Sequence, residues 1–172
     1  IVTGLILIPI LRKKKIGQYT TKLLNERHIK KEGTPTIGGI IFIIPTILVT
    51  LILLLTGKME YTTNLGIVLV VFLGYALIGF LDDFLSIRRG NNEGLTAYQK
   101  LFMQVLIAIG FFYIYMKNGG QTSFVVGMLG IDIELGWLYG LLILFVLVGA
   151  SNAVNLTDGL DGLAGGLSAI AF

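Results

Sequence analysis

The fold is decided by residues 135–154, which read LGWLYGLLILFVLVGASNAV. This stretch, Leu135–Val154, contains no Asp, Glu, Lys or Arg. A helix of about 20 apolar residues is long enough to cross the ~30 Å hydrocarbon core of a membrane. The apolar residues are continuous rather than alternating, which favours a helix over a strand. We therefore predict a membrane-spanning helix here.

Three more apolar runs and the overall composition extend this prediction to the whole chain. The runs are Ile37–Thr56, Leu65–Leu81 and Leu101–Met116. Of the 172 residues, 55% are hydrophobic and 13% are charged, whereas soluble domains carry about 25% charged residues. Disordered chains are rich in charge and poor in aliphatic residues, so disorder is excluded as well. We predict an all-α polytopic membrane protein, a multi-helix transmembrane bundle.

Local features are also predicted within and between these runs. Pro45 should kink its helix and leave one carbonyl for a neighbour to satisfy. Segments 124–128 and 131–134 could form a small external hairpin around Leu129-Gly130. Four glycines indicate close packing of helices in lipid, and they are Gly74, Gly79, Gly140 and Gly149.

The basic residues predict which side of the membrane each connection occupies. Eleven of the thirteen Lys and Arg residues lie in 12–31 and 88–100, and the other two connections hold Lys58 and Lys117. Positive charge marks the cytoplasmic side, so we expect the segments of about 12–36, 82–100 and 155–161 to be cytoplasmic. The basic run needs no nucleic acid as a partner, because a topology signal and attraction to anionic lipid explain it.

Both ends of the sequence predict a longer protein. Ile1–Leu11 is too short to span a membrane, and its basic residues follow the apolar run, unlike those of a signal peptide. The apolar run from Leu160 stops at Phe172 in mid-pattern. We expect residues 1–172 to be one transmembrane domain that is truncated at both ends, and inactive on its own.

Asp82 and Asp83 directly follow the run that ends at Leu81. The negative end of the helix dipole disfavours acids there, and the two carboxylates repel each other. A bound cation, or protonation of one carboxyl group, would offset both effects. The alternative interpretation is a pair of solvated acids beside Arg88 and Arg89.

A second acidic motif, NLTDGLDG, covers residues 155–162. A helix would place Asn155, Asp158 and Asp161 roughly on one face, whereas Gly159 and Gly162 suggest a turn between two helices. Either arrangement gathers the hard oxygen ligands that Mg²⁺ prefers. A helix N-cap with a glycine turn explains one of these aspartates but not both.

The segment KEGTPTIGG, residues 31–39, precedes another span. Thr34 and Thr36 could cap its helix, and a helix N-terminus also binds phosphate well. Lys31 could contact a phosphate or a base, or be one more topology charge. Carboxylates, backbone amides and basic residues at one membrane face indicate phosphoryl transfer, with a lipid phosphate as one possible substrate.

The three motifs, in this order, resemble those of the bacterial phospho-N-acetylmuramoyl-pentapeptide transferases, in the polyprenyl-phosphate N-acetylhexosamine-1-phosphate transferase superfamily. The residues concerned are KEGTPTIGG at 31–39, DDF at 82–84 and NLTDGLDGLA at 155–164. Gly17-Gln18 also fits, and the likeness covers essentially the whole chain.

This resemblance implies an enzyme that moves phospho-MurNAc-pentapeptide from UDP onto undecaprenyl phosphate, giving lipid I and UMP. It implies Mg²⁺ as cofactor and a location in the bacterial inner membrane with the active site on the cytoplasmic face. It also implies a homodimer and ten transmembrane helices, of which about six are wholly or partly present here.

The resemblance also implies roles for particular residues. Asp82 and Asp83 would be the catalytic pair. Substrate binding would involve Lys31, Thr36, Asn155, Asp158 and Asp161. The metal ligands would include Asp82 and Asn155, with a further Asp beyond Phe172.

The sequence departs from the family pattern at two positions, and other functions stay open. Ile37 stands where Met is common in the family. Ser86 stands where the family often has Lys, two residues after the aromatic residue of the Asp-Asp motif. Arg88 or Arg89 could replace that Lys as a phosphate contact. A sister enzyme that loads GlcNAc-1-phosphate onto undecaprenyl phosphate shares the acidic motifs. A transporter with a coupling cation at the rim is a further alternative, although no charged residue lies deep within a span.

Overall fold

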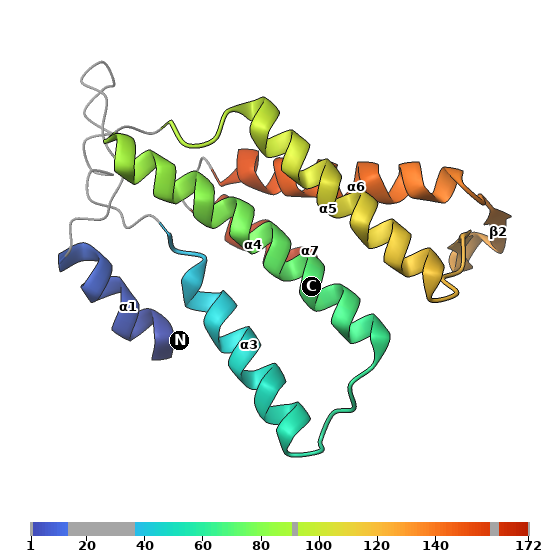
Figure 1. The fold of residues 1–172 in the computed structure, drawn as a ribbon, viewed down its shortest axis with the longest axis horizontal. Helices are drawn as coiled ribbons and strands as arrows, with labels where there is room; N and C mark the ends of the chain where they lie inside the picture. The colour runs from blue at the N-terminus through green and yellow to red at the C-terminus, as the bar shows by residue number, and fades with distance from the viewer. Residues whose placement is uncertain (1, 14–36, 91–92, 159–161, 172) are drawn as a thin grey trace. The chain divides into compact units, whose positions relative to one another are not determined.

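The computed structural model describes residues 2–13, 37–90, 93–158 and 162–171, and most of them are helical (Figure 1). The helices are α1 (Val2–Lys13), α3 (Ile40–Leu55), α4 (Thr63–Arg89), α5 (Ala97–Lys117), α6 (Leu138–Thr157) and α7 (Leu163–Ala171). The prediction of an all-α membrane protein is confirmed.

Three of these helices, α4, α5 and α6, are long and apolar enough to cross a membrane, and α3 is a shorter apolar helix of 16 residues. Their large apolar side chains are exposed, as Leu55 (86%) and Phe145 (75%) illustrate. Within the described parts of the chain, the buried apolar residues are Ile67, Ile78 and Ala108. Apolar faces of this extent suit contact with lipid or with further helices rather than with water.

The described structure divides into two compact units, residues 1–100 and 101–172. In the first unit α3 packs against α1 and contains Pro45. Proline has no N–H, so the carbonyl of Ile41, four residues earlier, loses its helical partner. The Thr3 hydroxyl of α1 donates a hydrogen bond of 2.9 Å to this carbonyl, which confirms that a neighbour satisfies it.

The second unit contains the predicted hairpin. Strands β1 (Ser123–Val126) and β2 (Ile131–Glu134) pair antiparallel, with Ser123 opposite Glu134. A short 3₁₀ turn, Gly127–Leu129, connects them and ends at Gly130, whose φ is +62°. The hairpin prediction is confirmed, although the first strand ends at Val126 rather than at Met128.

Close helix packing is confirmed at one of the predicted glycines. A Cβ atom on Gly140 of α6 would lie 2.7 Å from the Phe112 ring of α5. Gly79 and Gly149, in contrast, have open space around their Cα atoms. For these two glycines close packing stays a prediction, because no described helix lies against them.

The helix that carries the Asp pair is longer than predicted. It continues beyond Leu81 for about two turns and ends at Arg89, followed by Gly90 with φ +68°. A left-handed glycine after two arginines is a common end for a helix. Asp82 and Asp83 therefore lie inside α4 rather than after it, so the prediction that they follow the helix is wrong.

The second acidic motif lies between two helices, and its residues 159–161 lie outside the described residues. Helix α6 ends at Thr157 and α7 begins at Leu163. Gly162 has φ +82°, a left-handed conformation that glycine adopts easily. Asp158 is the C-cap of α6, so the interpretation of Asp158 as a helix N-cap is wrong.

Candidate active site

Asp82 is held by two donors from the segment that follows α4. One carboxylate oxygen, Oδ1, accepts a hydrogen bond of 2.8 Å from the backbone N–H of Leu95. The other, Oδ2, lies 2.7 Å from Nζ of Lys100. Both side chains are largely shielded, with exposed fractions of 25% for Asp82 and 20% for Lys100. Asp82 is thus a fixed carboxylate, and the interpretation of it as a solvated acid is wrong.

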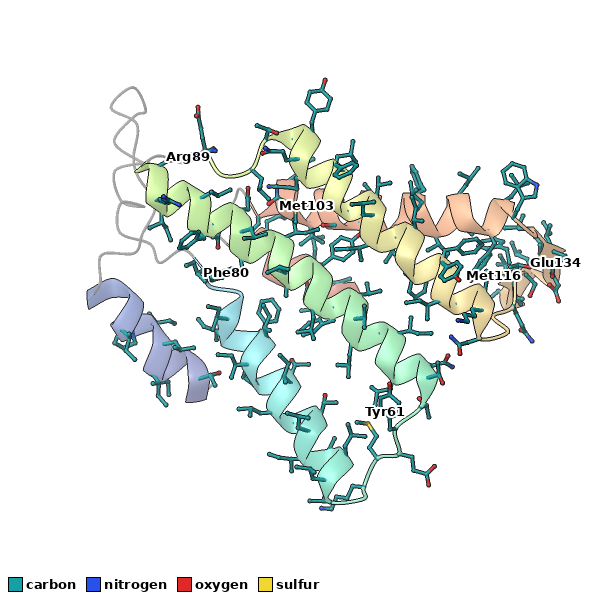
Figure 2. The ribbon with its side chains drawn as sticks, in the orientation of Figure 1. Tyr61, Phe80, Arg89, Met103, Met116 and Glu134 are labelled. Carbon is teal, nitrogen blue, oxygen red and sulfur yellow. The ribbon has the colours of Figure 1, made fainter. Side chains whose placement is uncertain are left out.

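The segment of residues 93–95, before α5, lies close against Asp82 and Arg89 of α4. Arg89, at the C-terminal end of α4 (Figure 2), donates from Nη1 to the carbonyls of Glu93 (3.2 Å) and Gly94 (2.7 Å). A Cβ atom on Gly94 would collide with both the main-chain oxygen and Oδ1 of Asp82. Only glycine therefore permits this approach of the loop.

A capping box fixes where α5 begins. The Thr96 hydroxyl accepts from the N–H of Gln99 (3.3 Å), and the Gln99 side chain accepts from the N–H of Thr96 (3.0 Å). This reciprocal pair defines a helix N-terminus and places Lys100 in the first turn of α5. The helix dipole disfavours a cation at this position, and the nearby carboxylate of Asp82 offsets this unfavourable interaction.

Asp83 has a different partner. Its Oδ2 accepts a hydrogen bond of 2.7 Å from the backbone N–H of Ile37, which lies 46 residues earlier in the sequence and just before α3. Ile37 has φ +62°, and a β-branched residue is strained in the left-handed region, by about 1–2 kcal/mol. Asp83 therefore fixes the strained entry to α3, where the N-cap residue Gly39 has no side-chain cap.

Asn155 and Asp158 lie at the end of α6, in the second compact unit. Both side chains are exposed. Asp158 stands at the negative end of the helix dipole, where an acid is unfavourable and a cation would compensate. The predicted site residues Lys31, Thr36 and Asp161 lie outside the described residues.

The comparisons with known proteins identify the family. Residues 65–172 match the family model described as glycosyl transferase family 4. The chain belongs to this family.

Relatives of this family-4 glycosyl transferase chain are named phospho-N-acetylmuramoyl-pentapeptide-transferase. The Bacillus subtilis (strain 168) protein is 46% identical over 167 residues, and the Oceanobacillus iheyensis and Bacillus licheniformis proteins are each 43% identical over the same length. Each alignment covers 97% of this chain and 51% of the relative. The chain thus spans about half the length of the curated relatives it matches, and the resemblance predicted from its three motifs is confirmed.

The donor atoms of this family-4 chain fit a hard divalent cation. Asp82 and Asp83 supply adjacent carboxylates, and Mg²⁺ usually takes one or two carboxylates together with phosphate oxygens and water. Within the described ranges, no group of three or more His, Cys, Asp or Glu residues gathers as a complete protein cage. The two adjacent carboxylates would hold such an ion together with phosphate oxygens and water.

Sequence reasoning found the acidic pair of the family-4 chain but missed the residues that hold it. In the sequence Lys100 is only one of the basic residues that indicate topology, and no pattern singles out Gly94 or the backbone of Leu95. One signal was available for Lys100. The Thr96-x-x-Gln99 pattern predicts a helix start, and a lysine directly after it is unfavourable unless an acid lies nearby.

Proposed function

We propose that this chain forms part of a phosphoglycosyl transferase that moves phospho-MurNAc-pentapeptide from UDP to undecaprenyl phosphate, giving lipid I and UMP. A phosphate oxygen of the lipid forms a bond to the phosphorus that carries the sugar. The bond from this phosphorus to the oxygen of UMP breaks, and UMP leaves. Such a reaction depends mainly on positioning and on neutralising charge on the phosphate oxygens.

The observation that carries this proposal is the pair of adjacent carboxylates. Asp82 is held by Leu95 and Lys100, and Asp83 is held by the N–H of Ile37 just before α3. Holding two negative groups side by side is unfavourable by itself. A site that binds a cation and a phosphate gains from this arrangement, because the carboxylates are already in place when the substrates arrive. The names of the relatives support the phospho-N-acetylmuramoyl-pentapeptide group as the one transferred, and the resemblance of the motifs implies UDP and undecaprenyl phosphate.

In this proposal each predicted residue keeps its role. Asp82 and Asp83 act on the phosphates, and Asp82 and Asn155 are metal ligands with a further Asp beyond Phe172. Substrate binding is assigned to Lys31, Thr36, Asn155, Asp158 and Asp161. Mg²⁺, when bound, would neutralise charge on the phosphate oxygens. The Lys100 ammonium orients the Asp82 carboxylate, and the Ile37 amide orients that of Asp83.

The proposal also includes a location and partners. We propose the bacterial inner membrane, with the acidic motifs on the cytoplasmic face, since eleven of the thirteen basic residues lie in connections on that side. The undecaprenyl chain would reach the site from the bilayer. A homodimer is the proposed assembly, and nucleic acid is not a partner.

The test uses the full-length protein in detergent with Mg²⁺, undecaprenyl phosphate and UDP-MurNAc-pentapeptide, and follows release of UMP with and without EDTA. We expect release that depends on Mg²⁺ and is largely lost in Asp83→Asn. Asparagine can still accept the hydrogen bond from Ile37, so this variant removes the charge while keeping the fold. Normal turnover in Asp83→Asn would remove Asp83 from the chemistry.

A second donor distinguishes the alternatives. UMP release with UDP-GlcNAc but not with UDP-MurNAc-pentapeptide would replace the proposed substrate and keep the reaction class. Cation-coupled uptake into liposomes without any UMP release would instead support the transporter interpretation.

A further inference from the structure

A buried polar cluster joins α5 to α6 within the second compact unit. Gln104 of α5 is 2% exposed, and it is the fully buried large side chain among the described residues. Its Nε2 donates to the Ser151 hydroxyl of α6 at 3.1 Å. Its Oε1 accepts from Nδ2 of Asn152, also of α6, at 2.8 Å. Asn152 Nδ2 donates in addition to the carbonyl of Val148, at 2.8 Å.

Apolar side chains alone would suffice to pack two helices in lipid. One turn further along α5, Ala108 is buried without any polar group. A glutamine in such surroundings is unfavourable unless its amide is paired, and here both its donor and its acceptor are used. Hydrogen bonds have strict geometry, so this cluster permits one rotation and one register of α6 against α5. Apolar contacts alone would tolerate small slips.

The cluster lies close in sequence to the predicted binding residues. On α6, Asn152 precedes Asn155 by three residues, about one turn, and Asp158 caps the same helix. On α5, Gln104 follows Lys100 by four residues, so the two lie on one face of the helix. The register that Gln104 imposes is therefore carried directly to the end of α6 where Asn155 and Asp158 lie.

We propose that Gln104 is a positioning residue for the nucleotide-sugar substrate. By bonding to Ser151 and Asn152, it fixes the rotation of α6 and so presents Asn155 and Asp158 to the nucleotide diphosphate. This inference rests on the proposed function, in which the end of α6 binds the sugar nucleotide.

The first experiment compares Michaelis constants in the full-length protein. Gln104→Met keeps the length of the side chain and removes both hydrogen bonds. We expect its KM for UDP-MurNAc-pentapeptide to rise by about threefold or more, the factor that a typical interhelical hydrogen bond in a membrane represents, while KM for undecaprenyl phosphate stays within error. Gln121→Met makes the same change at an exposed glutamine after α5 and should leave both constants unchanged.

A purely structural role gives a different result. Loss of folded protein lowers kcat per mole of protein and leaves both KM values as in the wild type. That outcome would overturn the proposal, as would an equal rise in both constants. Asn152→Leu should reproduce the effect, and the double variant Gln104→Met/Asn152→Leu should add little to it, because both changes remove the same bond.

The second experiment measures the position of α6 without any catalysis. The 172 residues contain no cysteine. Once any cysteine elsewhere in the full-length protein is replaced, spin labels can be placed at Phe102→Cys on α5 and Val154→Cys on α6, both on exposed side chains. We expect Gln104→Met to broaden or shift the distance distribution between the labels, and Gln121→Met to leave it unchanged. An unaltered distribution in Gln104→Met would show that Gln104 does not set the register.

The two experiments separate the possible failures. If the wild type releases no UMP, the proposed function fails and the assignment to a nucleotide sugar fails with it, while the spin labels still decide whether Gln104 fixes α6. If the wild type is active and Gln104→Met keeps both its KM values and its label distances, only the inference about Gln104 fails.

Discussion

Lys100 occupies a position that is unfavourable for a cation, and it pairs there with Asp82. It lies in the first turn of α5, where the helix dipole disfavours a cation, and its ammonium is 2.7 Å from Asp82. Replacing it by Met leaves Asp82 with the Leu95 amide as its remaining described partner. A hydrogen bond to a charged group contributes about 1.5–3 kcal/mol, so we expect turnover in Lys100→Met to fall roughly 10-fold to 100-fold.

The measurement is UMP release by the full-length protein. Lys117→Met is the matched control, because Lys117 ends the same helix and belongs to the connection predicted to face outward. Its turnover should be unchanged. Full activity in Lys100→Met would mean that the ion pair has no part in orienting Asp82.

A second prediction concerns the substitution of Gly94. The methyl group of Gly94→Ala would collide with the main chain of α4 at Asp82, so the loop must move and the hydrogen bond from Leu95 must lengthen. Overpacking of this kind destabilises by about 1–3 kcal/mol. We expect a lower melting temperature together with lower turnover. Gly79→Ala on α4, where a methyl group meets open space, should match the wild type in both measurements.

The packing of α1 against α3 depends on Thr3 and Pro45, and a double-mutant cycle can test how these two residues are coupled. Thr3→Val leaves the carbonyl of Ile41 without its donor, and an interhelical hydrogen bond in a membrane is worth about 0.6 kcal/mol on average and up to about 1.7 kcal/mol. Pro45→Ala returns an N–H to α3 that can bond to the same carbonyl. We expect Thr3→Val to lower thermal stability in the Pro45 protein and to have little effect in Pro45→Ala. An equal loss in both backgrounds would mean that the Thr3 hydroxyl is not what satisfies Ile41.

The helices show most clearly which parts of the structure can be predicted from the sequence. The helices over 40–55, 97–117 and 138–157 could be predicted because a run of apolar residues is itself the signal for a span. The extension of α4 to Arg89 does not follow from the apolar run, because charged residues come directly after Leu81. The actual end, Arg88-Arg89-Gly90, follows the ordinary rule for a helix C-terminus.

The partners of the Asp pair could not be predicted in the same way. Lys100 lies 18 residues from Asp82 and Ile37 lies 46 residues from Asp83, so no helical or strand period connects them. Their contacts depend on the path of the loop after α4 and on the left-handed turn at Ile37. Residue types indicate that an acidic site exists, whereas its hydrogen bonds follow from tertiary structure.

The distribution of basic residues along the whole chain predicts how it crosses the membrane. Eleven basic residues lie in connections assigned to the cytoplasm and two lie in the others. The absence of cysteine from these 172 residues allows single cysteines to report on this arrangement, provided that any cysteine elsewhere in the full-length protein is first replaced. Tyr98 at the start of α5 is 86% exposed and Met128 in the hairpin is 100% exposed, so both sites are accessible to a reagent.

We expect a membrane-impermeant maleimide to label Met128→Cys in intact cells from which the wall has been removed, and to label Tyr98→Cys only after the membrane is opened. Both variants should react equally in detergent, which controls for intrinsic reactivity. The reverse pattern would place the Asp82–Lys100 pair on the outer face, away from cytoplasmic UDP-sugars. The proposed reaction would then be impossible, whatever the geometry of its carboxylates.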